Sequence, residues 1–255
     1  MSERSSSSGL DSRSNKEKMK IVVSKNGPYL VFGEIPVEMQ IITPDKEGMS
    51  WDWINDKVLS PTPEEVEGES YFRLCRCGHS KNKPFCDDTH LKVKFEGKET
   101  ATRKPYDRQA EVTKGPNLNL SDAENLCAFA RFCDPHGQVW NLVGEDGEEA
   151  RKLTIREANH CPGGRLVVRD RKTGQVIEDE LPPSIGVIED PALGVSGPLW
   201  VRGRILIASE DGKPYEIRNR VTICRCGSSS NMPFCNGSHA SIHFKDGLYE
   251  FAKKK

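Results

Sequence analysis

One four-residue ligand pattern occurs twice and limits what this chain can fold around. The segment CRCGHSKNKPFCDDTH (75–90) returns as CRCGSSSNMPFCNGSH (224–239), with the same C-x-C-x8-C-x3-H spacing. The match continues on both sides, where HLKVKF aligns with HASIHF and GPYLVFGEIPV resembles GPLWVRGRILI. A repeat of this length is a duplicated module and not a solenoid unit. We therefore expect two copies of one small unit.

The two copies differ by an insertion. The upstream segments, which begin at 27 and 197, are 170 residues apart, whereas the motifs are 149 apart, so the first copy carries about 21 extra residues near EGMSWDWINDKVLSPTPEE. KIVVS, YLVFG, LWVRGRILIA and RVTIC are β-rich runs bounded by Gly and Pro. Each copy should therefore begin as a small β unit, and each motif should follow a strand.

Three thiolates and one imidazole form a complete set of four metal ligands. Cys86 and His90 are four residues apart, as are Cys235 and His239, so one helical turn would place each pair on one face. A closed Cys3His set suits tetrahedral Zn²⁺ or an iron–sulfur cluster. The C-x-C spacing is tighter than the usual zinc knuckle, which favours the cluster and leaves zinc as the alternative.

Both motifs resemble those of the CDGSH iron–sulfur proteins, the mitoNEET-like family, whose pattern is C-x-C-x2-(S/T)-x3-P-x-C-D-G-(S/T)-H. This chain departs from the pattern at Asp88, where the family has Gly, and at Asn236, where it has Asp. The resemblance implies two β-rich modules that pair beneath a shared β structure, here within one monomer. It also implies one [2Fe–2S] cluster per motif, held by Cys75, Cys77, Cys86 and His90 and by Cys224, Cys226, Cys235 and His239.

The histidine ligand makes such a centre less negative than four thiolates would, so it accepts an electron more readily. Its second ring nitrogen can take a proton when the electron arrives, and protonation also weakens the iron–nitrogen bond. We expect a reduction potential that falls with rising pH. Arg76 and Arg225 lie between the first two cysteines of each motif, either as surface charges or as cations that offset the negative cluster.

The segment between the repeats predicts a small ferredoxin-like α+β unit. Ser121 and Glu124 form a capping-box pattern before a helix that would carry Cys127, and Thr154 and Glu157 form one before Cys161. Pro162-Gly163-Gly164 ends that second helix. RLVVRDRKTGQVIE then predicts a hairpin that turns at residues 172–174. The resulting order of helix, strand, helix, strand, strand is compatible with the ferredoxin-like motif.

The cysteines of this segment follow C-x5-C-x27-C-P, which resembles single-cluster ferredoxins with a [3Fe–4S] centre and a divergent one-cluster ferredoxin domain. The implied ligands are Cys127, Cys133 and Cys161. A [4Fe–4S] cluster would need a fourth ligand, for which Asp134, His136 and His160 are candidates. Two alternatives stay open, three inert buried cysteines and a redox-active thiol pair.

The charge balance and the cysteine content indicate which partners and which cellular compartment to expect. Lys and Arg (37) balance Asp and Glu (38), and the net charge of -1 gives no general attraction to nucleic acid or to an anionic membrane. Nine cysteines without a secretory signal argue against a disulfide framework and favour a reducing, cytoplasmic compartment. The expected domains are a disordered tail (1–18), module 1 with a linker (19–116), the ferredoxin-like domain (117–190) and module 2 (191–255).

We therefore expect an α+β iron–sulfur protein for electron transfer or redox sensing, with two [2Fe–2S] clusters and a third, [3Fe–4S] cluster. It carries no evident nucleotide-binding or hydrolase motif, so we expect no substrate site of its own. The partner would be a redox protein or an apo-acceptor protein. The alternatives are a cluster carrier or donor, and a zinc-binding interaction module.

Overall fold

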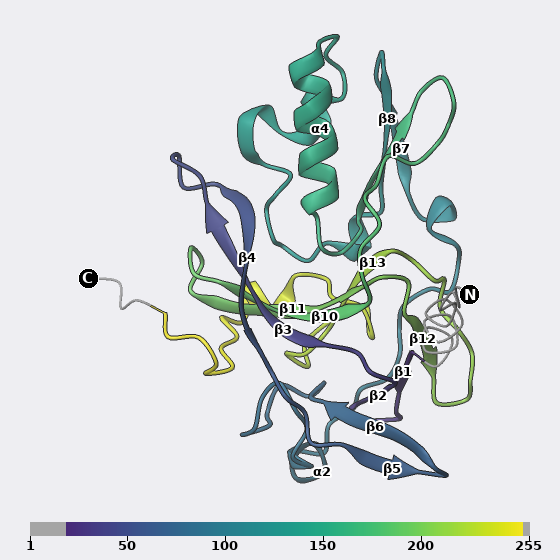
Figure 1. Cartoon of the computed structure of the whole chain (residues 1–255), viewed down its shortest axis with the longest axis vertical. Helices are drawn as coiled ribbons and strands as arrows, with labels where there is room; N and C mark the ends of the chain where they lie inside the picture. The colour runs from purple at the N-terminus through teal and green to yellow at the C-terminus, as the bar shows by residue number, and fades with distance from the viewer. Residues whose placement is uncertain (1–18, 252–255) are drawn as a thin grey trace, which may run out of the picture.

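Three β-sheets and a few short helices make up the part of the chain that the computed structural model describes, residues 19–251. The tail expected at 1–18 lies outside these residues. Figure 1 shows the sheets of the two repeats in the lower part of the view and the middle segment, with α4 (Glu148–His160), β7 (Glu111–Lys114) and β8 (Leu118–Asp122), above them. The expected α+β class is confirmed.

The two larger sheets each have five strands and contain strands of both repeats. The first has the order β12-β1-β2-β6-β5 and the second β13-β11-β10-β3-β4. The first-sheet strands are β12 (Leu206–Ser209), β1 (Lys20–Val23), β2 (Tyr29–Phe32), β6 (Glu69–Leu74) and β5 (Glu64–Val66). The second-sheet strands are β13 (Arg220–Ile223), β11 (Val195–Arg202), β10 (Ser184–Asp190), β3 (Val37–Pro44) and β4 (Ser50–Val58).

The repeats exchange one strand each. In the first sheet β12 of the second copy pairs in parallel with β1, and in the second sheet β3 of the first copy pairs in parallel with β10. Within each copy the pairs are antiparallel, β1 with β2 and β2 with β6 in the first, β10 with β11 and β11 with β13 in the second. The strands β12-β1-β2-β6 therefore correspond to β3-β10-β11-β13. One hydrophobic core runs through both copies and includes Val31, Leu199 and Ile223, each fully buried.

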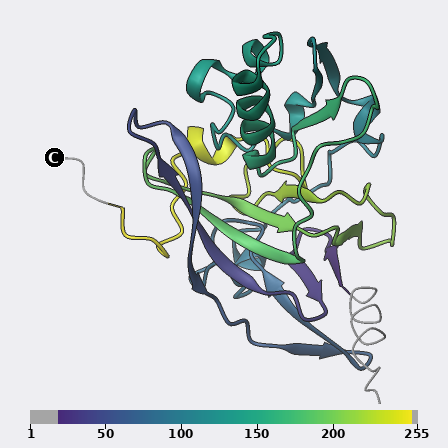
Figure 2. The same cartoon turned by 45° about the horizontal axis from the view of Figure 1, so that its top comes forward.

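The insertion in the first repeat supplies β4, which pairs with β3. Trp53 of β4 packs against Phe132 of the middle segment and Trp200 of β11, with ring centroids 4.7 and 4.8 Å apart. The inserted strand therefore packs the middle segment against the second sheet. In the turned view of Figure 2, the β3–β4 hairpin rises beside the middle segment.

The middle segment contains a three-stranded sheet, β7-β8-β9, with β9 at Leu166–Asp170. Two short 3-10 turns, η2 (Glu124–Leu126) and η3 (Pro135–Gly137), and the helix α3 (Val139–Leu142) precede α4. A further turn, η1 (Tyr106–Arg108), lies in the linker before β7. None of the helices among the described residues is long and apolar enough to cross a bilayer.

Two helix starts predicted in this segment are wrong. Ser121 belongs to β8, where it pairs with Val112 and Val167, so no helix begins there, and Cys127 follows η2 in an extended conformation. The second helix begins at Glu148, so Thr154 lies inside α4 and does not cap its start. The Thr154 hydroxyl donates to the carbonyl of Ala150 in the preceding turn. The helix before Cys161 is confirmed. The hairpin after it is reduced to one bridge, between Arg169 and Val176.

Candidate metal centres

Backbone pairing folds the first motif so that its third cysteine returns to the first two. The Cys75 N–H donates to the Pro84 carbonyl at 2.7 Å, and the Cys86 N–H donates to the Arg73 carbonyl at 3.0 Å. The sulfurs of Cys75 and Cys77 lie 3.8 Å apart. Two sulfurs that share a tetrahedral metal with bonds of about 2.3 Å are separated by about 3.8 Å. This pair is therefore spaced to bind one metal ion.

The second pair in this motif is Cys86 and His90, whose Sγ and Nδ1 atoms lie 3.4 Å apart. His90 belongs to α2 (Thr89–Lys92), a single turn. Asp87 orders the approach to α2, because its carboxylate accepts the Thr89 N–H at 3.1 Å. Asp88, the residue that departs from the family pattern, has a φ of 64°. It thus adopts the left-handed conformation that Asp tolerates better than most residues.

The second motif repeats this geometry. Cys224 and Cys226 have sulfurs 3.7 Å apart, and the Cys235 Sγ lies 3.5 Å from the His239 Nδ1 on α5 (Ser238–Ser241). Gly237, the counterpart of Asp88, is left-handed as well, with a φ of 84°. The Asp88 departure therefore leaves the turn unchanged.

In each close cysteine pair, one sulfur is stabilised as a thiolate by a hydrogen bond from the thiol of the other. The Cys77 thiol stabilises the Cys75 thiolate and lowers the pKa of Cys75 to about 6, and the Cys226 thiol lowers the pKa of Cys224 to about 6. The pKa of the donating thiol is raised in both pairs, first by its thiolate neighbour and then by burial. Each pair thus offers one thiolate beside one retained thiol, and a metal ion that binds both sulfurs would displace the remaining proton.

The four donors of each motif form two pairs instead of one compact quartet. Among the described residues, no three of the four ligand atoms of a motif lie within 4.8 Å of one another. A single tetrahedral zinc ion would need all four within about 4 Å. Two bridged metal ions, each bound by one pair, fit this arrangement.

The two motifs meet at their second cysteines. Cys77 and Cys226 form an isolated antiparallel bridge. A Cβ on Gly78 would lie 2.5 Å from the Cys226 carbonyl oxygen, and a Cβ on Gly227 would lie 2.5 Å from the Cys77 carbonyl oxygen. Both glycines also have φ near 80°. Only glycine permits this close approach, so the residue after the second cysteine sets how near the two sites lie.

The three cysteines of the middle segment lie around one loop and one helix end. Cys127 and Cys133 bound a loop in which Phe129 and Arg131 have left-handed φ values of 53° and 62°. Such values are unusual for these residue types and are common at functional sites. Burial and the neighbouring Asp134 and other two cysteines raise the pKa of Cys133.

Cys161 follows α4, and its turn packs against the start of the same loop. A Cβ on Gly163 would lie 2.4 Å from the Leu126 carbonyl oxygen, next to Cys127. Arg220 of β13 holds this turn, since its buried guanidinium donates to the carbonyls of Cys161 and Ala158 at 2.8 and 2.9 Å. The strand that leads into the second motif therefore also positions Cys161.

Of the candidates for a fourth ligand in the middle segment, Asp134 lies at the site, with its carboxylate 3.6 Å from the Cys133 sulfur. His136 instead pairs with Asp45 at 3.2 Å. The His160 Nδ1 lies 2.9 Å from the Arg156 carbonyl oxygen. Both histidines are thus engaged away from the three cysteines.

The middle segment also touches the second motif. A Cβ on Gly237 would lie 3.2 Å from the Phe129 Cβ and 3.5 Å from the Cys127 carbonyl oxygen. The Gly237 N–H in turn lies 3.4 Å from the Cys235 sulfur. The backbone at Cys127 therefore lies close to the turn that carries Cys235.

Sequence reasoning missed the surroundings of Arg76 and Arg225. The prediction of surface charges is wrong, because the two residues are only 1% and 2% exposed. Tyr29 was missed as well: it is fully buried in the first repeat, and its hydroxyl lies 2.7 Å from the Cys224 carbonyl oxygen of the second. The arginine between ligand cysteines in both copies was the one signal in the sequence for this buried network.

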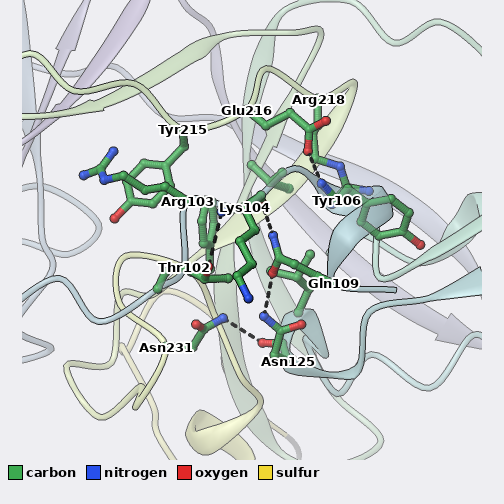
Figure 3. Close-up of a pocket in the computed structure, with 14 residues that line it drawn as sticks. Thr102, Arg103, Lys104, Tyr106, Gln109, Asn125, Tyr215, Glu216, Arg218 and Asn231 are labelled. Atoms are coloured by element: carbon green, nitrogen blue, oxygen red, sulfur yellow. Dashed lines mark hydrogen bonds between the residues drawn. The ribbon is translucent and has the colours of Figure 1, made fainter. Parts of the chain in front are cut away.

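A small cavity lies where the linker, the middle segment and the second repeat meet (Figure 3). Tyr106, Asn125, Tyr215 and Asn231 are among its lining residues, and its volume is about 20 Å³. That volume holds about one water molecule, so the cavity is too small for a substrate.

Comparisons with known proteins agree with this geometry. The family model described as iron-binding zinc finger CDGSH type matches residues 26–91 and 196–240. A second model, described as divergent 4Fe-4S mono-cluster, matches residues 113–171. No curated protein and no solved structure matched the chain significantly.

The fold, the donor pairs and these matches define an iron–sulfur protein. More particularly, two segments match the CDGSH-type family model, and the segment between them matches the divergent mono-cluster model.

Proposed function

We propose that this protein carries single electrons on three iron–sulfur clusters. Each CDGSH segment would hold one [2Fe–2S] cluster, with the two cysteines of the C-x-C on one iron and the third cysteine and the histidine on the other. The observation that carries this proposal is the division of each motif into two donor pairs, with sulfurs 3.8 and 3.7 Å apart in the C-x-C pairs. Zinc is disfavoured by the same division.

The third cluster would be held by Cys127, Cys133 and Cys161 as a [3Fe–4S] centre, for which three thiolates are a full set. A [4Fe–4S] centre is the alternative, with Asp134 as the fourth ligand. Electron transfer is supported by two proximities, because Cys127 lies near Gly237 of the second motif and Cys226 of that motif pairs with Cys77 of the first. In such a protein the clusters supply the redox chemistry, and the chain sets their separation and potentials.

Cluster donation to an apo-acceptor protein is the second candidate function. It is supported by the partial exposure of Cys86 in the first motif, although His90 beside it is buried. A histidine ligand is released on protonation more easily than a thiolate, which would favour transfer. A redox partner protein, an acceptor protein and a cytoplasmic location stay predictions.

Electron paramagnetic resonance on anaerobically purified protein tests the proposal. We expect a signal from the oxidised protein, given by [3Fe–4S], and new signals on reduction from the [2Fe–2S] centres. Loss of the oxidised signal alone in Cys133→Ser would assign it to the middle segment. A colourless, zinc-loaded protein would contradict the proposal, and stoichiometric transfer of iron to an apo-acceptor would favour donation.

A further inference from the structure

The two CDGSH sites contain one buried arginine each, in equivalent positions. The Arg76 Nε donates to the Gly27 carbonyl at 2.8 Å, and the Arg225 Nε donates to the Gly197 carbonyl at 2.6 Å. Both guanidinium groups lie over an equivalent phenylalanine ring, at 5.2 and 5.6 Å from the centroid. The repeat has therefore preserved the cation beside both sites.

The charges that face these two arginines differ. Arg76 donates its remaining hydrogen bonds to the carbonyls of Gly97 and Ser24, at 2.7 and 2.6 Å. No carboxylate of the described residues pairs with it within 4 Å. Its positive charge therefore faces backbone carbonyls and the rings of Tyr29 and Phe95, without a carboxylate among the described residues.

Arg225 instead pairs with two carboxylates, Glu189 at 2.9 Å and Asp246, and both of these side chains are fully buried. Asp246 is the repeat counterpart of Gly97, since both follow their motif histidine by seven residues. Burial raises the pKa of Glu189 to about 7. The second site thus carries one buried negative charge at Asp246 and, above about pH 7, a second at Glu189, and the first site lacks both.

Other charged neighbours also differ between the two sites. The Lys83 ammonium donates to the Ser80 carbonyl at 2.7 Å, and its counterpart in the second motif is the neutral Met232. The first site also has a carboxylate, Asp88, within 4.8 Å of the Cys86 and His90 ligand atoms, but Arg73 pairs with it and offsets its charge. Cys86 is partly exposed, whereas Cys235 is buried and the middle segment covers the adjacent Gly237. Figure 1 places α2, which carries His90, at the end of the molecule away from α4.

We infer that the two [2Fe–2S] centres have unequal reduction potentials and that a single electron on the pair rests on the first centre. This inference depends on the proposed function, because it requires a [2Fe–2S] cluster in each motif. The reduced cluster is more negative than the oxidised one, so buried carboxylates and low exposure disfavour reduction of the second centre. The step is a transfer of one electron from the reduced second centre to the oxidised first centre, and no bond forms or breaks.

Unequal potentials would give electron transfer between the two centres a preferred direction. The second centre, which adjoins the third cysteine set, would pass electrons outward, and the first centre would hold them where a partner protein has access. Glu189 and Asp246 are positioning residues in this scheme, because they act on the cluster through Arg225.

A potentiometric titration of the full-length protein, followed by electron paramagnetic resonance, tests the inference. We expect two reduction steps in the [2Fe–2S] signals. His90→Cys should shift the upper step to a lower potential, and His239→Cys should shift the lower step. One common potential for both centres, or movement of the lower step in His90→Cys, would overturn the inference.

Glu189→Gln then tests the cause, since glutamine keeps an acceptor for Arg225 and removes the charge. We expect the lower step to rise and the upper step to stay in place. The matched control is Glu38→Gln, which also removes a carboxylate from an arginine pair in the second sheet. Its partner Arg202 lies five residues, about 16 Å, along β11 from Gly197.

Equal shifts in Glu189→Gln and Glu38→Gln would overturn the assignment of Glu189. If Glu189→Gln does not fold, the two histidine variants still decide whether the potentials differ and in which order. Absence of any [2Fe–2S] signal together with absence of acid-labile sulfide would instead refute the proposed function.

Discussion

At the scale of single residues, the proposed histidine ligands would determine the charge of each cluster. His90 and His239 would contribute neutral imidazoles where a cysteine would add a thiolate. His90→Cys should therefore lower the potential of its centre, by on the order of 100 mV, as judged from the difference between histidine-ligated and all-cysteine clusters. A redox titration measures this shift. His243→Asn, which changes a histidine outside both motifs, is the control, and an unchanged potential in His90→Cys would contradict the ligand assignment.

Glu157 is a second residue for which the structure predicts an effect, here on the pH dependence of stability. It is 1% exposed, and neither carboxylate oxygen has a hydrogen-bond partner among the described residues. Burial and then the nearby Asp134 raise its pKa to about 8, from the usual 4.5. The folded state therefore holds this proton more tightly than the unfolded state, and stability present below pH 4.5 is lost as the pH rises toward 8.

Glu157→Gln should remove this loss. Because glutamine carries no ionisable proton, the melting temperature of the variant should fall less than that of the parent protein between pH 5 and 8. The difference in the free energy of unfolding at pH 8 should be about 1–3 kcal/mol. Glu148→Gln, on the exposed start of the same helix, should behave like the parent protein. Parallel melting curves for all three proteins across this range would refute the account of Glu157.

At the scale of elements, the turn after each C-x-C decides whether the repeats can meet. Gly78→Ala adds a Cβ 2.5 Å from the Cys226 carbonyl oxygen and also strains a left-handed residue. Gly68 has the same φ of 79°, but nothing lies within 4 Å of its Cβ position. Gly68→Ala should therefore cost only the backbone strain, about 1–2 kcal/mol.

Gly78→Ala should cost about 2–5 kcal/mol, because overpacking adds to that strain. It should also lower the iron content per chain, while Gly68→Ala keeps its iron. Thermal melting and iron analysis of the two variants measure both effects. Equal losses in the two variants would show that the close contact between the motifs is not important for stability.

The same scale shows what the sequence could and could not predict. The strands predicted from KIVVS, YLVFG and RVTIC form, because their β-branched and aromatic residues bury one face in a sheet. The exchange of β3 and β12 between the repeats was not predictable, since local alternation does not specify which distant strand becomes the neighbour. The capping pattern at Ser121 failed because pairing on both sides of β8 outweighed a local preference.

At the sites themselves, the spacing predicted the close approach of Cys86 to His90, but not the network around the arginines. A charged residue between two ligands has no local signature of burial. Its partners come from sequence positions up to 52 residues away for Arg76, namely Ser24, Gly27 and Gly97. Only the tertiary fold brings these carbonyls together.

At the scale of the whole molecule, one chain supplies both halves of the paired arrangement. Residues 91–223 link the two motifs covalently. The strand exchange, the shared core and the bridge between Cys77 and Cys226 join the repeats through non-covalent contacts. The insertion strand β4 and Arg220 then attach the middle segment to the second repeat. The second site is thus enclosed by protein on the side that the first site leaves open.

Measurement of iron, zinc and acid-labile sulfide in the full-length protein, purified without oxygen, tests the central claim most directly. Two [2Fe–2S] clusters and one [3Fe–4S] cluster predict roughly seven iron atoms and eight sulfides per chain. A variant with serine at Cys127, Cys133 and Cys161 should retain roughly four of each. Sulfide-free protein that contains two zinc ions would contradict the claim that the duplicated motifs hold iron–sulfur clusters.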